Sequence, residues 1–249
     1  MFVNHFSADH TLGLPGVVQG LEMKGRDRPL DLYVPDGRTR RAVDMIEGAY
    51  RWPSYAVNVH GYSAVEPAMQ TDEYTIRATN TPYTEWSHGL VVEEKDRREF
   101  LPERAQARGL EPGPKYGRLQ DGQAVETDDG RTIEPEEVLS EPTPGRKIVY
   151  TSDTRPTADI VDAAAGASLL IYAAMFTAEQ ADRARSTGQS TAADVGRVAA
   201  EADSRRLWLT HISPRHEGDE QTLEAEARAV FDGDVVAARD GDTTEITHD

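Results

Sequence analysis

The stretch NHFSADH at residues 4–10 follows a short apolar run and places two histidines and an aspartate close together. Imidazole and carboxylate groups at such spacing are typical of part of a metal site. His5, Asp9 and His10 are therefore candidate ligands, whereas Ser7 stands where a metal-binding pattern would have another imidazole. The same residues would also suit a polar turn after a buried strand, so the rest of the chain has to decide between the two interpretations.

The composition limits the classes of protein to which the chain can belong. Its 249 residues suit one large domain or two small ones, and no apolar run approaches the roughly 20 residues of a membrane span. The start, MFVNHFSADH, lacks the basic and apolar blocks of a signal peptide, so we expect a cytoplasmic protein. Because there is no cysteine, histidine, aspartate and glutamate must hold any metal.

The charge balance is strongly acidic, with a formal net charge of −17. Nearly all of the basic residues are arginine, and this acidic, lysine-poor composition resembles that of proteins from salt-loving archaea. In molar salt the Debye length is only about 3 Å, so the surplus charge repels itself and other anions little. The net charge therefore does not exclude a nucleic-acid partner.

Short apolar runs, several of them bounded by Gly, Pro or Asp, predict strands. They lie at residues 1–3, 30–34, 55–59, 74–78, 147–150, 168–172, 206–210, 234–238 and 243–247. Apolar residues at helical spacing predict helices over 43–50, 191–202 and 223–231. Strands that alternate with helices in the second half favour a layered α/β fold. Residues 93–146 are instead rich in charge, Gly and Pro, and we expect them to form an arm-like insertion.

Six segments together resemble ribonuclease Z, the metallo-β-lactamase-fold endonuclease family that trims the 3′ end of precursor tRNA. They are NHFSADHTLGLPG (4–16), PGPKYGRLQDG (112–122), YTSDTRP (150–156), YAAMF (172–176), GQSTAAD (188–194) and LTHISPRH (209–216), in the order of the family's motifs. The resemblance implies an α/β fold of the metallo-β-lactamase type, an αββα sandwich formed by one domain over 1–249. The family has further strands before the first motif, so we expect a sandwich that lacks them.

The resemblance also implies where metal would bind, because the family holds two zinc ions. The residues matching one of the two sites are all present: Asp9, His10, Asp153 and His211. Zinc in a catalytic site needs about three protein ligands and an open position, and this set meets that need. For Asp153 and His211 the alternatives are a turn-bracing aspartate and a core histidine.

The other family site is depleted in this chain. It keeps His5, and it would share Asp153 with the first site, but Ser7 replaces one histidine. Tyr83 replaces the mid-chain histidine, unless His88 takes that role. A neutral hydroxyl is a poor ligand, and Tyr83 would have to lose its phenolic proton to bind well. We therefore expect at most one zinc ion.

The family's proton-handling positions are altered as well. Where the family has the glutamate of HEAT and the histidine of HST, this chain has Ala173 and Gln189. An amide can orient a neighbouring group but cannot deliver a proton near neutral pH. Loss of a general acid or base typically lowers a rate by about 10²–10⁴-fold. Asp9 is the candidate catalytic residue if the chain is active.

The arm-like insertion carries the candidate RNA contacts, because the family uses this segment to hold the tRNA body. Lys115, Tyr116 and Arg118 combine a cation for phosphates with a ring for stacking. The alternative is a solvated basic patch that balances the acidic surface, which is our interpretation of RTRR at 38–41.

These observations lead to one main expectation and two alternatives. We expect a degenerate ribonuclease Z paralogue with weak or no tRNA 3′-end endonuclease activity, which binds tRNA or an active family member as a homodimer or heterodimer. The first alternative is a working single-metal phosphodiesterase, and the second is one half of a split ribonuclease Z. The substituted positions leave open whether the chain is an enzyme, although the family is one of zinc-dependent endoribonucleases.

Overall fold

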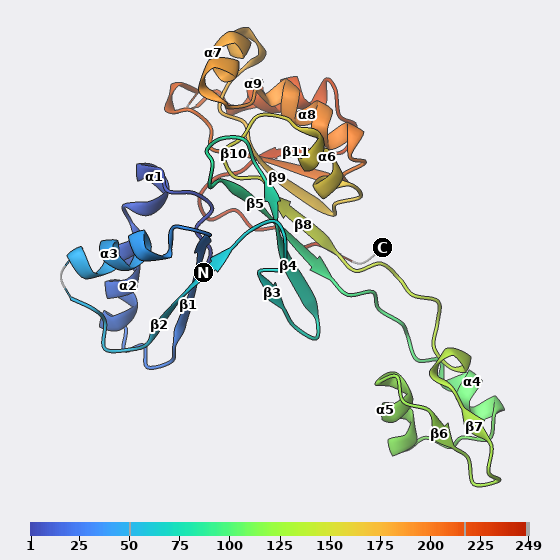
Figure 1. The fold of residues 1–249 in the computed structure, drawn as a ribbon. Coiled ribbons are helices and arrows are strands. Elements are labelled where there is room, and N and C mark those ends of the chain that lie inside the picture. The colour runs from blue at the N-terminus through green and yellow to red at the C-terminus, as the bar shows by residue number, and fades with distance from the viewer. Residues whose placement is uncertain (50, 217, 248–249) are drawn as a thin grey trace. The chain divides into compact units, whose positions relative to one another are not determined.

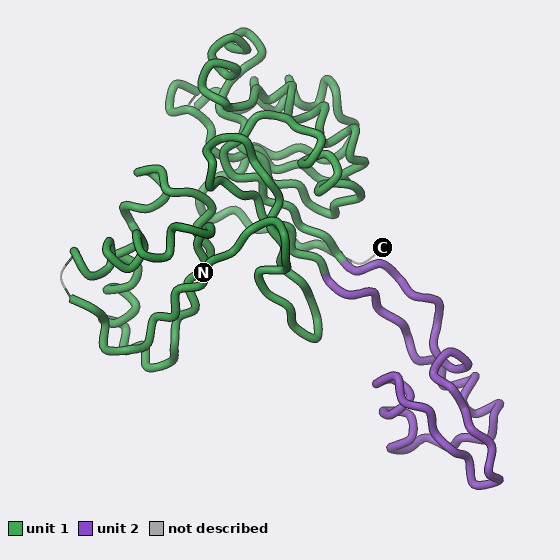
Figure 2. Tube along the Cα trace, viewed as in Figure 1, with its two compact units in different colours: residues 1–93, 146–249 green, residues 94–145 purple. Residues whose placement is uncertain are grey.

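The computed structural model describes residues 1–49, 51–216 and 218–247. The chain forms two compact units: unit 1 comprises residues 1–93 and 146–249, and unit 2 comprises residues 94–145 (Figure 2). Within the described ranges, the helices are all too short or too polar to cross a membrane. Tyr50, which the sequence places at the end of a helix, lies outside the described residues.

The first half of unit 1 is a small parallel sheet covered by helices (Figure 1). Its elements are α1 (Ala8–Thr11), α2 (Leu14–Met23), β1 (Leu30–Pro35), α3 (Thr39–Ala49) and β2 (Val57–Tyr62). β1 pairs with β2, and Phe2 adds a single bridge to Tyr33. Alternate residues of β1 are buried with Val18 of α2 and Ile46 of α3. One face of the strand and one face of each helix thus form a single apolar cluster.

The second half of unit 1 is built on a seven-stranded sheet with the order β11-β10-β9-β8-β5-β4-β3. Its strands are β3 (Met69–Gln70), β4 (Tyr74–Asn80), β5 (His88–Glu94), β8 (Lys147–Tyr150), β9 (Leu169–Ala173), β10 (Arg206–Thr210) and β11 (Asp234–Ala237). β8, β9, β10 and β11 run parallel to one another, whereas β5 is antiparallel to β8. Parallel strands place their carboxyl ends at one edge, which is where a site can be assembled.

Helices cover one face of this sheet (Figure 1). The helical segments of this half are α6 (Ala158–Ala164), η2 (Ala178–Gln180), α7 (Ala181–Thr187), α8 (Ala192–Glu201), η3 (Pro214–His216) and α9 (Glu220–Arg228). Leu170 and Leu207 of the sheet are fully buried with Val195 of α8 and Leu223 of α9. At Gly196 the two helices are so close that an added Cβ would lie 2.7 Å from the Ala227 carbonyl oxygen.

Most predicted strands are present, with several differences. Residues 1–3 were predicted to form a strand, and this is wrong: they form only the single bridge from Phe2 to Tyr33. The two-residue strand β3 was not predicted. β5 was not predicted, because its apolar core is only three residues long and charged residues follow it. Residues 243–247 were predicted to form a strand, and this is wrong: they are irregular. Backbone carbonyl groups of this segment accept hydrogen bonds from arginine side chains. Arg206 donates to the Glu245 carbonyl oxygen, and Arg146 donates to the Ile246 carbonyl oxygen.

Unit 2 follows β5 in the sequence and has a small apolar cluster of its own. Its elements are α4 (Pro102–Ala107), α5 (Pro114–Gln120), β6 (Val125–Glu126), β7 (Thr132–Ile133) and η1 (Pro135–Glu137). Leu110, Leu119, Val125 and Val138 are buried together, with Phe100 packed against them. Its apolar residues are too scattered to give a clear period, which is why the sequence did not indicate this cluster.

Candidate metal centre

Two of the candidate ligands lie at the carboxyl ends of parallel strands. Asp153 is in the buried loop after β8, and His211 is the first residue after β10. Both turns use backbone with positive φ, at 58° for Ser152 and 53° for His211. Such values are uncommon for residues with a Cβ and are held only where the surrounding structure fixes them, often at functional sites.

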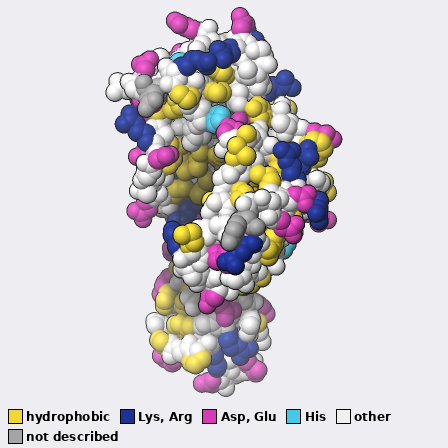
Figure 3. Space-filling model, turned by 90° about the vertical axis from the view of Figure 1, so that its left-hand side faces the viewer, with side chains coloured by type: hydrophobic (Ala, Val, Ile, Leu, Met, Phe, Trp, Pro, Cys, Tyr) yellow, Lys and Arg dark blue, Asp and Glu magenta, His cyan; other side chains and the backbone are white. Residues whose placement is uncertain are grey.

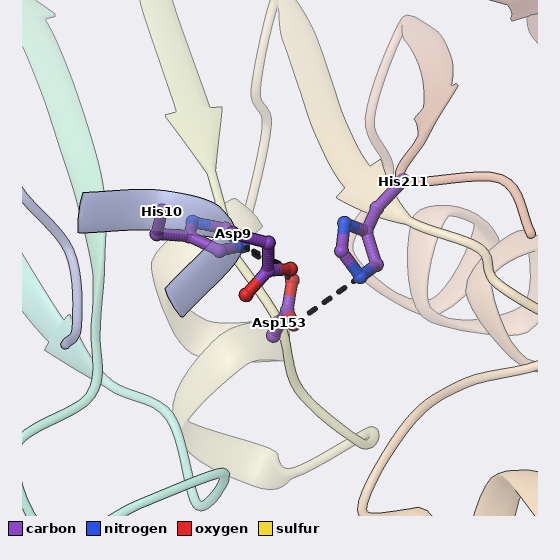
Figure 4. A group of neighbouring side chains, drawn as sticks. All are labelled: Asp9, His10, Asp153 and His211. Atoms are coloured by element: carbon purple, nitrogen blue, oxygen red, sulfur yellow. Dashed lines mark ion pairs between the residues drawn. The ribbon is translucent and has the colours of Figure 1, made fainter. Parts of the chain in front are cut away.

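The other two come from the N-terminal layer. α1 begins directly after Ser7, and it presents Asp9 and His10 towards Asp153 (Figure 4). The Asp9 side chain is 61 % exposed and the His10 side chain 19 % exposed, whereas that of Asp153 is 4 % exposed. The group therefore has a buried anchor on the large sheet and an open side formed by α1.

The geometry fits one cation. Asp9, His10, Asp153 and His211 each offer one ligand atom, and these atoms all lie within 4.8 Å of one another. The His211 Nε2 to Asp153 Oδ2 distance is 3.3 Å, His10 Nε2 to Asp9 Oδ2 is 3.5 Å, and His10 Nε2 to Asp153 Oδ1 is 3.7 Å. A tetrahedral ion with bonds of about 2.0–2.2 Å separates its ligand atoms by about 3.3–3.6 Å. Two imidazoles and two carboxylates are a suitable donor set for a divalent ion such as zinc.

His5 lies beside this group, without being part of it. It is fully buried, its Nδ1 is 3.2 Å from Ser152 Oγ, and its Nε2 is 4.0 Å from Asp153 Oδ2. Burial, followed by the nearby His10, lowers the pKa of His5 to about 4, so the ring is neutral near pH 7. A neutral ring leaves one nitrogen available as a ligand.

The residues that would have to complete a second site with His5 offer little to a metal. The Tyr83 ring meets the His5 ring edge-on at 5.2 Å. Ser7 caps α1 through its backbone, with its carbonyl oxygen accepting from the Thr11 hydroxyl. His88, the alternative to Tyr83, packs its ring 5.5 Å from that of Tyr62, and burial lowers its pKa. The described residues therefore assemble one complete ligand group.

The altered proton-handling positions have structural roles. Ala173 is the last residue of β9 and is buried. Gln189 is also buried, and its Nε2 donates to Asp153 Oδ2 at 3.0 Å. The sequence identified Gln189 only as a replaced proton donor, because nothing in its local pattern shows that the fold brings it to Asp153, 36 residues earlier.

The candidate RNA contacts all lie in α5 of unit 2, in different settings. The Lys115 ammonium pairs with Asp128 at 2.9 Å. The Tyr116 hydroxyl donates to the Leu110 carbonyl oxygen, and its ring packs on Phe100 at 4.6 Å. Arg118 is exposed. Acidic and basic side chains are interspersed on the face of the molecule that Figure 3 shows.

Comparison with the sequences of known proteins shows the family of the chain. The chain is 44% identical to ribonuclease Z of Natronomonas pharaonis over 246 residues, which are 98% of this chain and 80% of that protein. The chain belongs to the ribonuclease Z family. Ribonuclease Z of Haloferax volcanii is 39% identical over 249 residues, covering 100% and 78% of the two chains. The Myxococcus xanthus protein of the same name is 37% identical over 247 residues, covering 99% and 80%. No family model matches the chain.

Solved structures confirm the predicted fold class, an α/β metallo-β-lactamase fold. The short form of human tRNase Z aligns with a TM-score of 0.64 at 18% identity, over 99% of this chain and 78% of that one. The metallo-β-lactamase fold protein YhfI from Bacillus subtilis aligns with a TM-score of 0.61 at 20% identity, over 94% and 72%. The resemblance to ribonuclease Z inferred from the six motifs is thus confirmed for nearly the whole chain.

Proposed function

We propose that this ribonuclease Z-family protein binds tRNA, holds one divalent metal ion, and has weak or no 3′-end endonuclease activity. The observation that carries the proposal is the contrast between the two halves of the centre. One complete group of four ligands is assembled around Asp153, while the neighbouring His5 faces a tyrosine ring. A two-metal clamp on both oxygens of an in-line displacement needs ligands for both ions.

Asp9, His10, Asp153 and His211 would hold the ion, with zinc as the expected metal. When bound, a divalent ion supplies Lewis acidity towards a phosphodiester oxygen. Asp153 would supply a buried anionic ligand, and Asp9 would close the site from its exposed side. Gln189 donates a hydrogen bond to Asp153, but it cannot protonate a leaving group.

The tRNA part of the proposal rests on the family and on unit 2. Lys115 and Arg118 are the candidate phosphate contacts, although Lys115 has to exchange Asp128 for a phosphate oxygen. Tyr116 keeps α5 packed on Phe100, so its contribution to RNA contact is to hold the two cations in place. We also propose, from the family alone, that the chain pairs with a second copy or with an active family member, which light scattering tests directly.

The decisive assay is cleavage of a precursor tRNA in high salt with Zn²⁺ or Mn²⁺, beside Asp9→Ala and a gel-shift measurement of binding. High salt suits an acidic chain whose relatives include haloarchaeal proteins. We expect binding with little or no cleavage. Efficient cleavage at the 3′ end that Asp9→Ala abolishes would contradict the proposal.

One observation favours a second function, a single-metal phosphodiesterase. Three of the distances between ligand atoms, at 3.3, 3.5 and 3.7 Å, are close to those of an occupied tetrahedral site, and Asp153 is hydrogen-bonded in place. Metal-dependent hydrolysis of a small phosphodiester, lost in Asp9→Ala and in His211→Ala, would support this function in place of a binding role.

A further inference from the structure

The side chain of Gln189 is oriented by Asp153. It is 5 % exposed, its Nε2 donates to Asp153 Oδ2 at 3.0 Å, and its Oε1 is buried without a hydrogen-bond partner among the described residues. An ionised carboxylate only accepts hydrogen bonds, so the amide must turn its N–H towards Asp153. Leaving the amide oxygen unpaired is unfavourable. The amide therefore keeps its N–H on Asp153 although its oxygen has no partner among the described residues.

The histidines around Asp153 do not make an equivalent contact. Their Nε2 atoms lie 3.3 Å (His211), 3.7 Å (His10) and 4.0 Å (His5) from the nearest carboxylate oxygen. An ordinary N–H···O hydrogen bond spans about 2.7–3.2 Å. Among these neighbours, Gln189 alone lies within that range. It is thus the side chain that fixes the rotation of the carboxylate before any ion arrives.

Gln189 is itself mounted on rigid structure. α7 ends at Thr187 and is followed by Gly188, whose φ of 70° turns the chain. The Gln189 backbone N–H donates to the Ala184 carbonyl oxygen at 2.9 Å. On the other side, the Ser190 hydroxyl donates to the Thr154 carbonyl oxygen at 2.7 Å. Thr191 then begins α8 with a capping box. Gln189 and Ser190 together bind the Asp153 loop to the start of a buried helix.

We propose that Gln189 is a positioning residue for the metal ligand Asp153. Its amide holds Oδ2, so that the carboxylate is already turned towards the ligand atoms of His10 and His211. Loss of a hydrogen-bond donor that contacts a metal ligand typically changes metal affinity by about 10–100-fold. The proposal rests on the one-ion site proposed above, and it gives the residue at a lost proton-transfer position a separate role.

The test is the zinc affinity of the full chain, measured by competition with a chromophoric chelator. Gln189→Met keeps an unbranched side chain of similar length but removes the donor, and we expect it to weaken zinc binding by about 10–100-fold. Gln189→His restores a ring N–H donor and should recover most of the affinity. Ser190→Ala is the matched control, because it removes the neighbouring hydrogen bond to the same loop without touching the carboxylate.

Thermal unfolding of the metal-free variants checks that each one folds. If Gln189→Met does not fold, Gln189→Leu repeats the test with another side chain that has no donor. Unchanged affinity in the donor-free variant, or no recovery with histidine, would overturn the positioning role. If the wild-type protein bound no zinc, the one-ion function would fail. The role of Gln189 would then be decided by its side-chain amide exchange in the metal-free protein. Faster exchange in Asp153→Ala than in the wild-type protein supports it, and unchanged exchange contradicts it.

Discussion

Replacing Asp9 by alanine should separate metal binding from folding. The Asp9 side chain is 61 % exposed and lies in the first turn of the four-residue helix α1. Its loss should therefore change the stability of the metal-free protein by no more than about 1 kcal/mol, the value of a favourable charge at a helix N-terminus. Its loss from the ligand group removes one of four ligand atoms.

The expected magnitude follows from binding linkage. Zinc at about 100 times its dissociation constant stabilises the wild-type protein by about 2.7 kcal/mol. For a chain of this length that raises the melting temperature by about 5–11 °C, at about 2–4 °C per kcal/mol. If the variant binds about 100-fold more weakly, the same zinc concentration adds only about 0.4 kcal/mol and about 1–2 °C.

The assay is thermal unfolding with and without zinc, followed by circular dichroism. Asp159→Ala is the matched control, because Asp159 is also an exposed aspartate in the first turn of a helix, α6, outside the ligand group. We expect the control to keep the full zinc shift. A full shift in Asp9→Ala as well would refute the assignment of Asp9 as a ligand.

Three further predictions follow from packing, pH and charge. Gly196→Ala places a Cβ 2.7 Å from both the Ala227 carbonyl oxygen and Val230 Cγ2. It should lower the free energy of unfolding, measured in urea, by about 1–3 kcal/mol. An unchanged urea midpoint would contradict the close packing of α8 on α9. Burial lowers the pKa of His5 from 6.5 to about 4, so the folded protein binds that proton less readily than the unfolded chain. The unfolding free energy of the metal-free protein should therefore fall as the pH drops from about 6.5 to about 4, and it should fall less in His5→Gln. Equal falls in the two proteins would contradict the burial of a neutral His5. Arg118→Ala should weaken tRNA binding and reduce the salt-dependence slope by about 1; a slope equal to that of the wild type would remove Arg118 from the interface.

The parts of the fold that the sequence predicted are those with dense local signals. The apolar runs at 147–150 and 206–210 match β8 and β10, because buried parallel strands require such runs. β5 was missed because its apolar core is short. It is a strand because it pairs with β8, whose residues are more than 50 positions away. The apolar spacing over 191–202 correctly predicted α8, which begins after a capping box formed by Thr191 and Asp194.

Only part of the candidate site could be predicted from the sequence. Motif order suggested Asp9, His10, Asp153 and His211 as one group, and the fold brings these four together. The hydrogen bond from Gln189 to Asp153 and the burial of His5 against Ser152 depend on long-range packing. They join residues 36 and 147 positions apart, for which no local pattern exists.

The number of metal ions per chain tests the central claim most directly. Protein saturated with zinc, freed of unbound metal and measured by elemental analysis, should contain one ion per chain, and Asp153→Ala should contain none. Two ions per chain would contradict the claim, because they would mean that His5 and its neighbours complete a second site. Absence of zinc from the wild-type protein would contradict it equally.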